Sequence, residues 1–261
     1  MLLLFQVLNI FSFIAVVIVN FLAVSLPLNG QTTGEIAYQY PSLFTPARFT
    51  FIIWRLIYIL LTGFVVYQAQ GLLKKEPKNP HLLEKVSWLF ILSSLANIGW
   101  IFLWHYNRLQ PALIMIGILL VSLVFIYNRL GFKHTQLNRK EYIFVYLPFS
   151  VYLAWVTIST VGNLSVLLVD IEWDGWGLSQ TFWTVVALFC LLVLANLYLW
   201  GWHDRVYPAV FIWAFIGIFY QRIVLGDPAY YVIGVVALIA AVLLSHQSFM
   251  RLKRLKSLDC I

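Results

Sequence analysis

Residues with aromatic or carboxamide side chains recur at helical spacing in three apolar stretches of the chain. These residues are Trp54 and Tyr58 in the first stretch, Asn97 and Trp100 in the second, and Tyr152, Trp155 and Asn163 in the third. Side chains three or four residues apart lie on the same face of an α-helix, so each set would share a face. Indole and phenol rings offer flat apolar surfaces, and carboxamides among them can orient the polar groups of a ligand. The pattern therefore predicts a cavity that binds a flat, largely apolar ligand.

The alternative is a purely structural role for the same residues. An asparagine in hydrocarbon needs a hydrogen-bond partner, so Asn97 is expected to face other helices whether or not a ligand binds. In that case the asparagines would only join helices, and the rings would only fill the space between them.

Hydrolytic, metal and nucleotide chemistry find no support in the sequence. Every aspartate and glutamate lies in or beside a loop, so no pair of buried carboxylates is available for acid–base catalysis. The five histidines are scattered, without the HExxH or CxxC spacing of metal sites. There is no GxSxG elbow and no phosphate-binding glycine loop, and Cys190 and Cys260 give no disulfide framework. The sequence therefore assigns no catalytic residue, no metal site and no required cofactor.

The elements that must position the aromatic residues are helices that cross a membrane. Of the 261 residues, 62% are hydrophobic and only 10% are charged, whereas soluble domains carry about 25% charged residues. Apolar runs of about twenty residues, separated by short charged loops, indicate membrane-spanning helices. Eight spans are predicted, at residues 2–24, 49–71, 86–106, 112–130, 142–161, 181–201, 207–225 and 230–249. The first run resembles a signal peptide in part, but it lacks a basic beginning and is too long, which favours a retained helix.

The distribution of basic residues predicts the orientation in the membrane. Thirteen of the seventeen lysines and arginines fall in alternate loops and in the C-terminal tail. Positively charged loops mark the cytoplasmic side, so both termini are predicted to be cytoplasmic. Arg55 lies inside the second predicted span. It would either extend its guanidinium to the membrane surface or pair with an anionic group of the ligand.

Three motifs in this sequence resemble those of the TspO/MBR family, the translocator proteins (peripheral-type benzodiazepine receptors) and tryptophan-rich sensory proteins. The family motifs are PPxWVFxPVWxxLY, matched from Pro46 to Tyr58; LNxxW, matched by Asn97 and Trp100; and PYLxW…LN, matched by Tyr152, Trp155 and Asn163. They occur in order on the second, third and fifth predicted spans, and the resemblance covers about residues 1–165. The sequence departs from the motifs at Ile52 and Val151, where the family has proline. The whole chain resembles a long bacterial-type member of the family.

This resemblance implies an all-α integral membrane protein. A five-helix core would occupy residues 1–165, three additional transmembrane helices residues 166–250, and a basic cytoplasmic tail residues 251–261. The implied function is a multipass receptor or sensor that binds porphyrin, haem or a similar tetrapyrrole, with the outer proline-containing loop as a lid. The ligand-binding residues would be Trp54, Arg55, Tyr58, Asn97, Trp100, Tyr152, Trp155 and Asn163. Some bacterial members are associated with light-dependent porphyrin breakdown, and Trp54 and Trp155 match the tryptophans implicated in it.

Two other functions fit the same sequence. A secondary transporter of a small hydrophobic solute is one, although coupled transport generally needs ionisable groups or broken helices at mid-membrane, and the sequence offers only Arg55, toward one end of its span. A membrane scaffold or regulatory protein, with a partner on the acidic outer loop or the basic tail, is the other. The expected partners are the lipid bilayer, a hydrophobic ligand and a second copy in a homodimer, and the expected location is a bacterial cell membrane.

Overall fold

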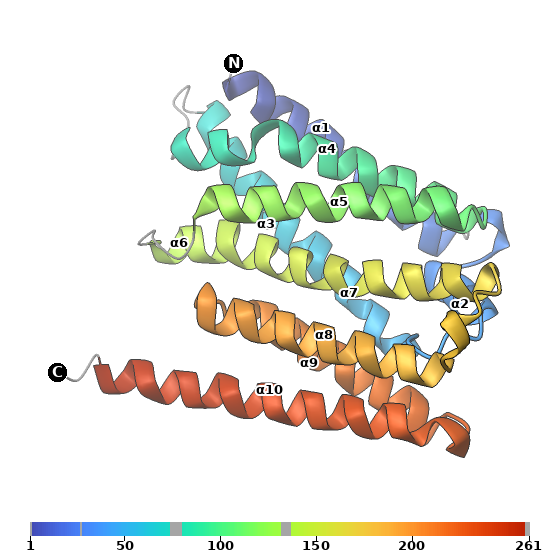
Figure 1. Ribbon diagram of the computed structural model, residues 1–261. Coiled ribbons are helices and arrows are strands. Elements are labelled where there is room, and N and C mark those ends of the chain that lie inside the picture. The colour runs from blue at the N-terminus through green and yellow to red at the C-terminus, as the bar shows by residue number, and fades with distance from the viewer. Residues whose placement is uncertain (1, 27, 74–79, 132–136, 259–261) are drawn as a thin grey trace. The chain divides into compact units, whose positions relative to one another are not determined.

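Helices make up the protein. The computed structural model describes residues 2–26, 28–73, 80–131 and 137–258, and these described residues contain no strand (Figure 1). The α-helices are α1 (Leu2–Ser25), α2 (Thr33–Gln39), α3 (Ile53–Leu73), α4 (Pro80–His105), α5 (Leu109–Leu130), α6 (Arg139–Glu141), α7 (Leu147–Asp170), α8 (Gln180–Gly201), α9 (Val206–Phe219) and α10 (Tyr231–Leu258). Shorter helical segments are η1 (Leu28–Gly30), η2 (Arg48–Ile52), η3 (Tyr142–Tyr146), η4 (Gly175–Gly177), η5 (Tyr220–Val224) and η6 (Pro228–Tyr230).

Eight helical segments among the described residues are long and apolar enough to cross a membrane. Each corresponds to one of the predicted spans, which confirms the prediction of an all-α, multi-span membrane protein. The fifth span was predicted to end at residue 161, whereas α7 continues to Asp170. A single glycine, here Gly162, costs about 1 kcal/mol inside a helix but does not end it when apolar residues continue beyond. Asn163 therefore lies inside α7.

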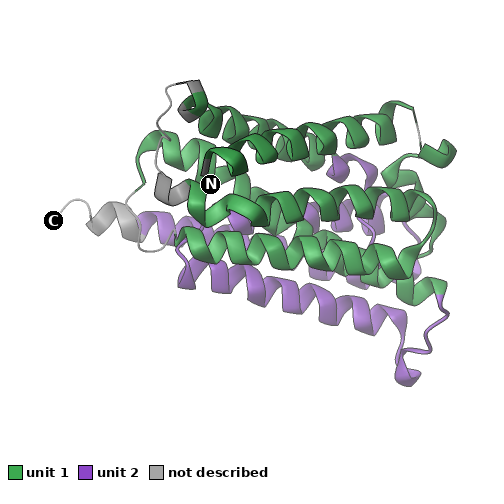
Figure 2. Ribbon diagram, turned by 90° about the horizontal axis from the view of Figure 1, so that it is seen from above, with its two compact units in different colours: residues 1–41, 52–170 green, residues 42–51, 171–261 purple. Residues whose placement is uncertain are grey.

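The chain divides into two compact units, drawn in green and purple in Figure 2. The first unit comprises Met1–Pro41 and Ile52–Asp170, and the second comprises Ser42–Phe51 and Ile171–Ile261. The boundary falls after Asp170, and the residue-165 boundary implied by the resemblance lies inside α7. The ten residues Ser42–Phe51, which precede α3 in the sequence, group with the C-terminal helices because their contacts are with α9 and η5.

The helix α1 illustrates why these helices pack as they do. Its inward-facing residues follow one another at steps of three and four, which keeps them on one face: Gln6, Asn9, Phe13, Val16, Asn20 and Ala23. The opposite face exposes apolar side chains such as Phe11, Ile18 and Phe21. In a membrane protein, exposed apolar side chains contact lipid, so α1 turns one face to lipid and the other to α3 and α4.

A layer of four phenylalanines fills the core of the first unit. Phe13, Phe64, Phe90 and Phe149 come from α1, α3, α4 and α7, and all are buried. Their ring centroids lie 4.9–6.4 Å apart, within the range of favourable aromatic contacts. This layer joins the helices that carry the predicted site residues.

In the second unit, α9 packs against α8 and α10. Tyr198 of α8 stacks on Tyr207 of α9 with ring centroids 3.8 Å apart. The buried Asp204 begins α9 by accepting hydrogen bonds from the backbone N–H groups of Val206 and Tyr207. A short turn, with Asp227 as the cap of η6, connects η5 to α10. These contacts tie the three C-terminal spans into one bundle.

Candidate ligand-binding site

Trp54, in the first turn of α3, is the centre of an aromatic cluster in the first unit. Its ring stacks on that of Tyr58 with centroids 5.9 Å apart and on that of Trp100 with centroids 5.5 Å apart. It meets the rings of Tyr152 and Trp155 nearly edge to face, each with a centroid distance of 6.3 Å. Residues of α3, α4 and α7 that were predicted from spacing alone therefore contact one another directly.

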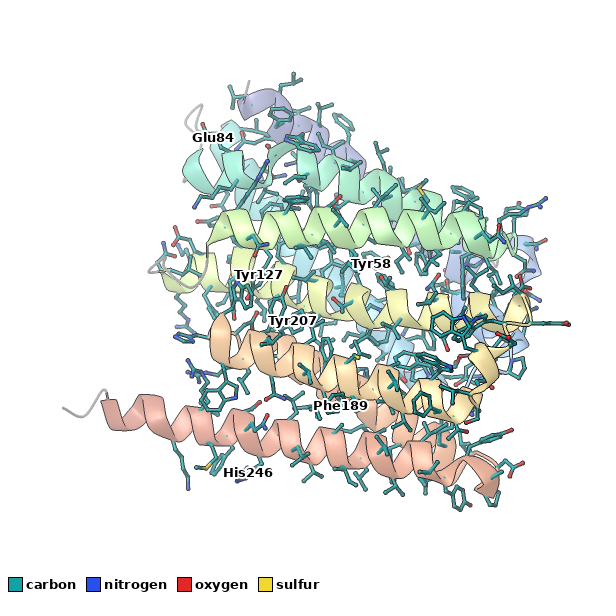
Figure 3. All side chains as sticks on the ribbon, viewed as in Figure 1. Tyr58, Glu84, Tyr127, Phe189, Tyr207 and His246 are labelled. Carbon is teal, nitrogen blue, oxygen red and sulfur yellow. The ribbon has the colours of Figure 1, made fainter. Side chains whose placement is uncertain are left out.

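Carboxamides and hydroxyl groups join the same residues through hydrogen bonds. The hydroxyl of Tyr58, labelled in Figure 3, donates to Oδ1 of Asn20 at 2.7 Å. Nδ2 of Asn20 donates to Oδ1 of Asn97 at 2.8 Å, and Nδ2 of Asn97 donates to the hydroxyl of Tyr152 at 3.2 Å. The chain of bonds therefore crosses from α3 through α1 and α4 to α7.

Asn163, the other asparagine among the predicted site residues, is buried next to Trp100. Trp100 donates its indole Nε1–H to Oδ1 of Asn163 at 2.9 Å. This bond depends on the continuation of α7 beyond residue 161, because Asn163 lies two turns after Trp155 on that helix. Trp104 adds a further ring, stacked on Trp100 with centroids 6.2 Å apart.

The residues that α3 contributes to the cluster are more exposed than those from α4 and α7. Asn97, Trp100, Tyr152, Trp155 and Asn163 are buried, while Trp54 and Tyr58 are half-buried. The rings of α3 are therefore the more exposed part of the cluster. The buried rings and amides behind them hold Trp54 and Tyr58 in place.

Arg55 is the one predicted site residue that the structure does not bring together with the others. Its side chain is exposed, on the face of α3 that also carries the exposed Leu56 and Ile59. The buried face of α3 is formed by Ile57, Leu61 and other apolar residues. This position is compatible with a guanidinium that extends to the membrane surface.

Asn20 also belongs to this cluster, although none of the three motifs includes it. It lies in the first predicted span. The sequence does indicate a polar inward face on α1, because Gln6, Asn9 and Asn20 carry carboxamides at helical spacing in an otherwise apolar helix.

The other two carboxamides of that face form a second polar cluster with Gln68 of α3. Nε2 of Gln6 donates to the backbone oxygen of Gln68 at 3.1 Å, and Nδ2 of Asn9 donates to Oε1 of Gln68 at 3.2 Å. All three side chains are at most 2% exposed. Along α3, Phe64 of the phenylalanine layer separates this cluster from Tyr58. The two polar clusters are therefore separate features of the first unit.

In the second unit, the irregular segment Ser42–Phe51 is held by side chains of α9 and η5. Nη2 of Arg222 donates to the backbone oxygens of Ser42 and Thr45, and Nε1 of Trp213 donates to that of Thr50 at 3.0 Å. The backbone N–H of Ala47 donates to the oxygen of Gly217 at 3.0 Å. Residues 42–47 are buried, and buried backbone without helical bonds needs such partners.

Within the described part of the chain, no group of three or more histidine, cysteine, aspartate or glutamate side chains could hold a metal ion. Cys190 is an exposed free thiol, and Cys260 lies outside the described residues.

Asn97→Leu is expected to lower the free energy of unfolding by about 1–2 kcal/mol, because it removes two hydrogen bonds inside the membrane. Thermal unfolding in maltoside micelles measures the change. Ser93→Ala on the same helix is the matched control, since the hydroxyl of Ser93 bonds only to the carbonyl of Phe90 one turn earlier. Equal stability of the two variants would show that the hydrogen-bond chain contributes nothing.

Together these features define a class: an integral, multi-pass helical membrane protein with an aromatic and carboxamide cluster within one helical unit. The chain belongs to the TSPO-like protein family, whose family model matches residues 6–250. The match extends beyond the residues that carry the three motifs and includes the C-terminal helices. No curated protein and no solved structure matches the chain.

Proposed function

We propose that this protein is a membrane receptor or sensor that binds a flat hydrophobic tetrapyrrole, such as porphyrin or haem, on the aromatic cluster around Trp54. The observation that carries the proposal is the partly exposed pair of stacked rings, Trp54 and Tyr58, backed by buried rings from α4 and α7. A flat ring system gains both buried apolar area and favourable ring contacts on such a surface.

The hydrogen-bonding groups of the cluster support the same proposal. The hydroxyl of Tyr58 and the carboxamide of Asn20 lie beside the half-buried rings, where they can orient polar substituents of the ligand. An indole next to an excited porphyrin can also quench it. The family resemblance associates this chemistry with Trp54 and Trp155, but no catalytic residue is assigned to this chain.

Titration with protoporphyrin IX tests the proposal. Purified protein in maltoside should lose tryptophan fluorescence in a saturable manner as protoporphyrin is added. N-acetyltryptophanamide in the same micelles is the control for quenching without a site. Quenching no stronger than in this control would reject tetrapyrrole binding.

We also propose that both termini are cytoplasmic, on the basis of the basic residues alone. Lys74, Lys75, Lys78 and Lys133, which contribute to this argument, lie outside the described residues. In a background with Cys190 and Cys260 replaced by serine, a cysteine at Lys253 should resist a membrane-impermeant maleimide in intact cells, and one at Arg108 should react. The reverse pattern would contradict this orientation. The homodimer stays a prediction.

A further inference from the structure

Three tryptophans gather at the turn between α7 and α8, and none of them is a residue of the candidate site. Trp173 and Trp176 lie on the turn, and Trp183 lies in the first turn of α8. Their ring centroids are 5.3–5.5 Å apart, with interplanar angles of 51–80°. Two of the three pairs meet edge to face and the third is tilted, while Trp173 and Trp183 are half-buried. The indole of Trp176 is 76% exposed.

The backbone of the turn holds Trp176 outward. Nε1 of Trp183 donates to the oxygen of Gly175 at 2.9 Å, and the backbone N–H of Trp176 donates to Oδ1 of Asp174 at 3.0 Å. Gly175, Trp176 and Gly177 all have φ between 53° and 79°. Because this left-handed region is uncommon for a bulky residue, the flanking glycines and the two hydrogen bonds are what hold the indole there.

The turn that carries the cluster is negatively charged. Glu172 and Asp174 on the same turn are exposed. The sequence contains no lysine or arginine from residue 141 to residue 204. Indole faces and carboxylates together attract a cation, and proteins use aromatic side chains to recognise quaternary ammonium groups.

The turn connects two membrane-spanning segments, Arg139–Asp170 and Gln180–Gly201, so it lies at the level of the lipid headgroups. We propose that Trp173, Trp176 and Trp183, with Glu172, form a site for the quaternary ammonium of a choline lipid headgroup. Tryptophans at a membrane surface also act as simple anchors, and that role needs no cation. The two roles differ in their selectivity for the headgroup, which makes the proposal testable without any porphyrin.

The test uses the full chain labelled with 5-fluorotryptophan and ¹⁹F NMR in maltoside. The resonance that is absent in Trp176→Leu identifies Trp176. Tetramethylammonium chloride should shift this resonance saturably, while sodium chloride at equal ionic strength should not. In nanodiscs of phosphatidylcholine the shift should already be present, and in nanodiscs of phosphatidylglycerol it should be absent.

Glu172→Gln should weaken tetramethylammonium binding about threefold, because it removes one carboxylate but leaves the indoles in place. The matched control is Trp88→Leu, which removes another exposed tryptophan and should leave the titration unchanged. Equal responses to tetramethylammonium and sodium, or equal spectra in the two kinds of nanodisc, would overturn the proposal and leave an anchor of ordinary interfacial tryptophans.

Discussion

Replacing Trp54 with leucine is expected to weaken protoporphyrin binding about 30-fold, equivalent to about 2 kcal/mol. The ring of Trp54 contacts rings on both α4 and α7. Leucine keeps an apolar side chain but removes the flat surface and the stacked contact with Tyr58. The dissociation constant from fluorescence titration measures the loss.

Three further variants make this experiment specific. Trp54→Phe keeps a ring and should lose less affinity than Trp54→Leu. Trp88→Leu removes an exposed tryptophan of the same unit that lies outside the cluster, and should bind as the wild type does. Arg55→Leu distinguishes the two roles of the arginine, since unchanged affinity would exclude pairing with a propionate of the ligand. Normal binding by Trp54→Leu would contradict the proposed site.

Gly217→Ala should release the segment Ser42–Phe51 from α9 and lower the free energy of unfolding by about 1–3 kcal/mol. A Cβ atom at Gly217 would lie 2.5 Å from Oγ1 and 2.7 Å from Cγ2 of Thr50. Thr50 cannot move aside easily, because it is β-branched and its hydroxyl donates to the oxygen of Ala47. Hydrogen exchange followed by mass spectrometry should show lower protection in residues 42–51.

A second substitution separates this contact from a general effect on α9. Thr50→Ala removes both close atoms, so adding it to Gly217→Ala should restore much of the protection and stability, and the two changes should be non-additive. Gly117→Ala is the matched control, because nothing lies within 4 Å of its added Cβ. A helix-interior alanine there should raise stability slightly. If Gly217→Ala behaves like Gly117→Ala, the close packing of the segment on α9 is not a constraint.

The class of the protein and its eight spans could be predicted from the sequence, because both depend on local properties. A run of about twenty apolar residues must cross the bilayer as a helix, since its backbone groups have no water to bond to. The shared faces of Trp54 with Tyr58, and of Asn97 with Trp100, follow from helical periodicity alone. The sequence also predicted that these helix faces meet. In the structure, the ring of Trp54 contacts the rings of Trp100 on α4 and Trp155 on α7, so the faces do lie against one another.

Partners distant in sequence were decided only by the tertiary structure. Asn20 joins Tyr58 to Asn97, and Arg222 holds the carbonyls of Ser42 and Thr45, yet nothing in a carboxamide or a guanidinium specifies its partner. The helix α7 continues through Gly162, because its apolar contacts outweigh the small free-energy cost of a glycine inside a helix. Helix propensity alone does not include those contacts. Spacing determines which side chains share a face. Which faces meet depends on how all the helices pack at once.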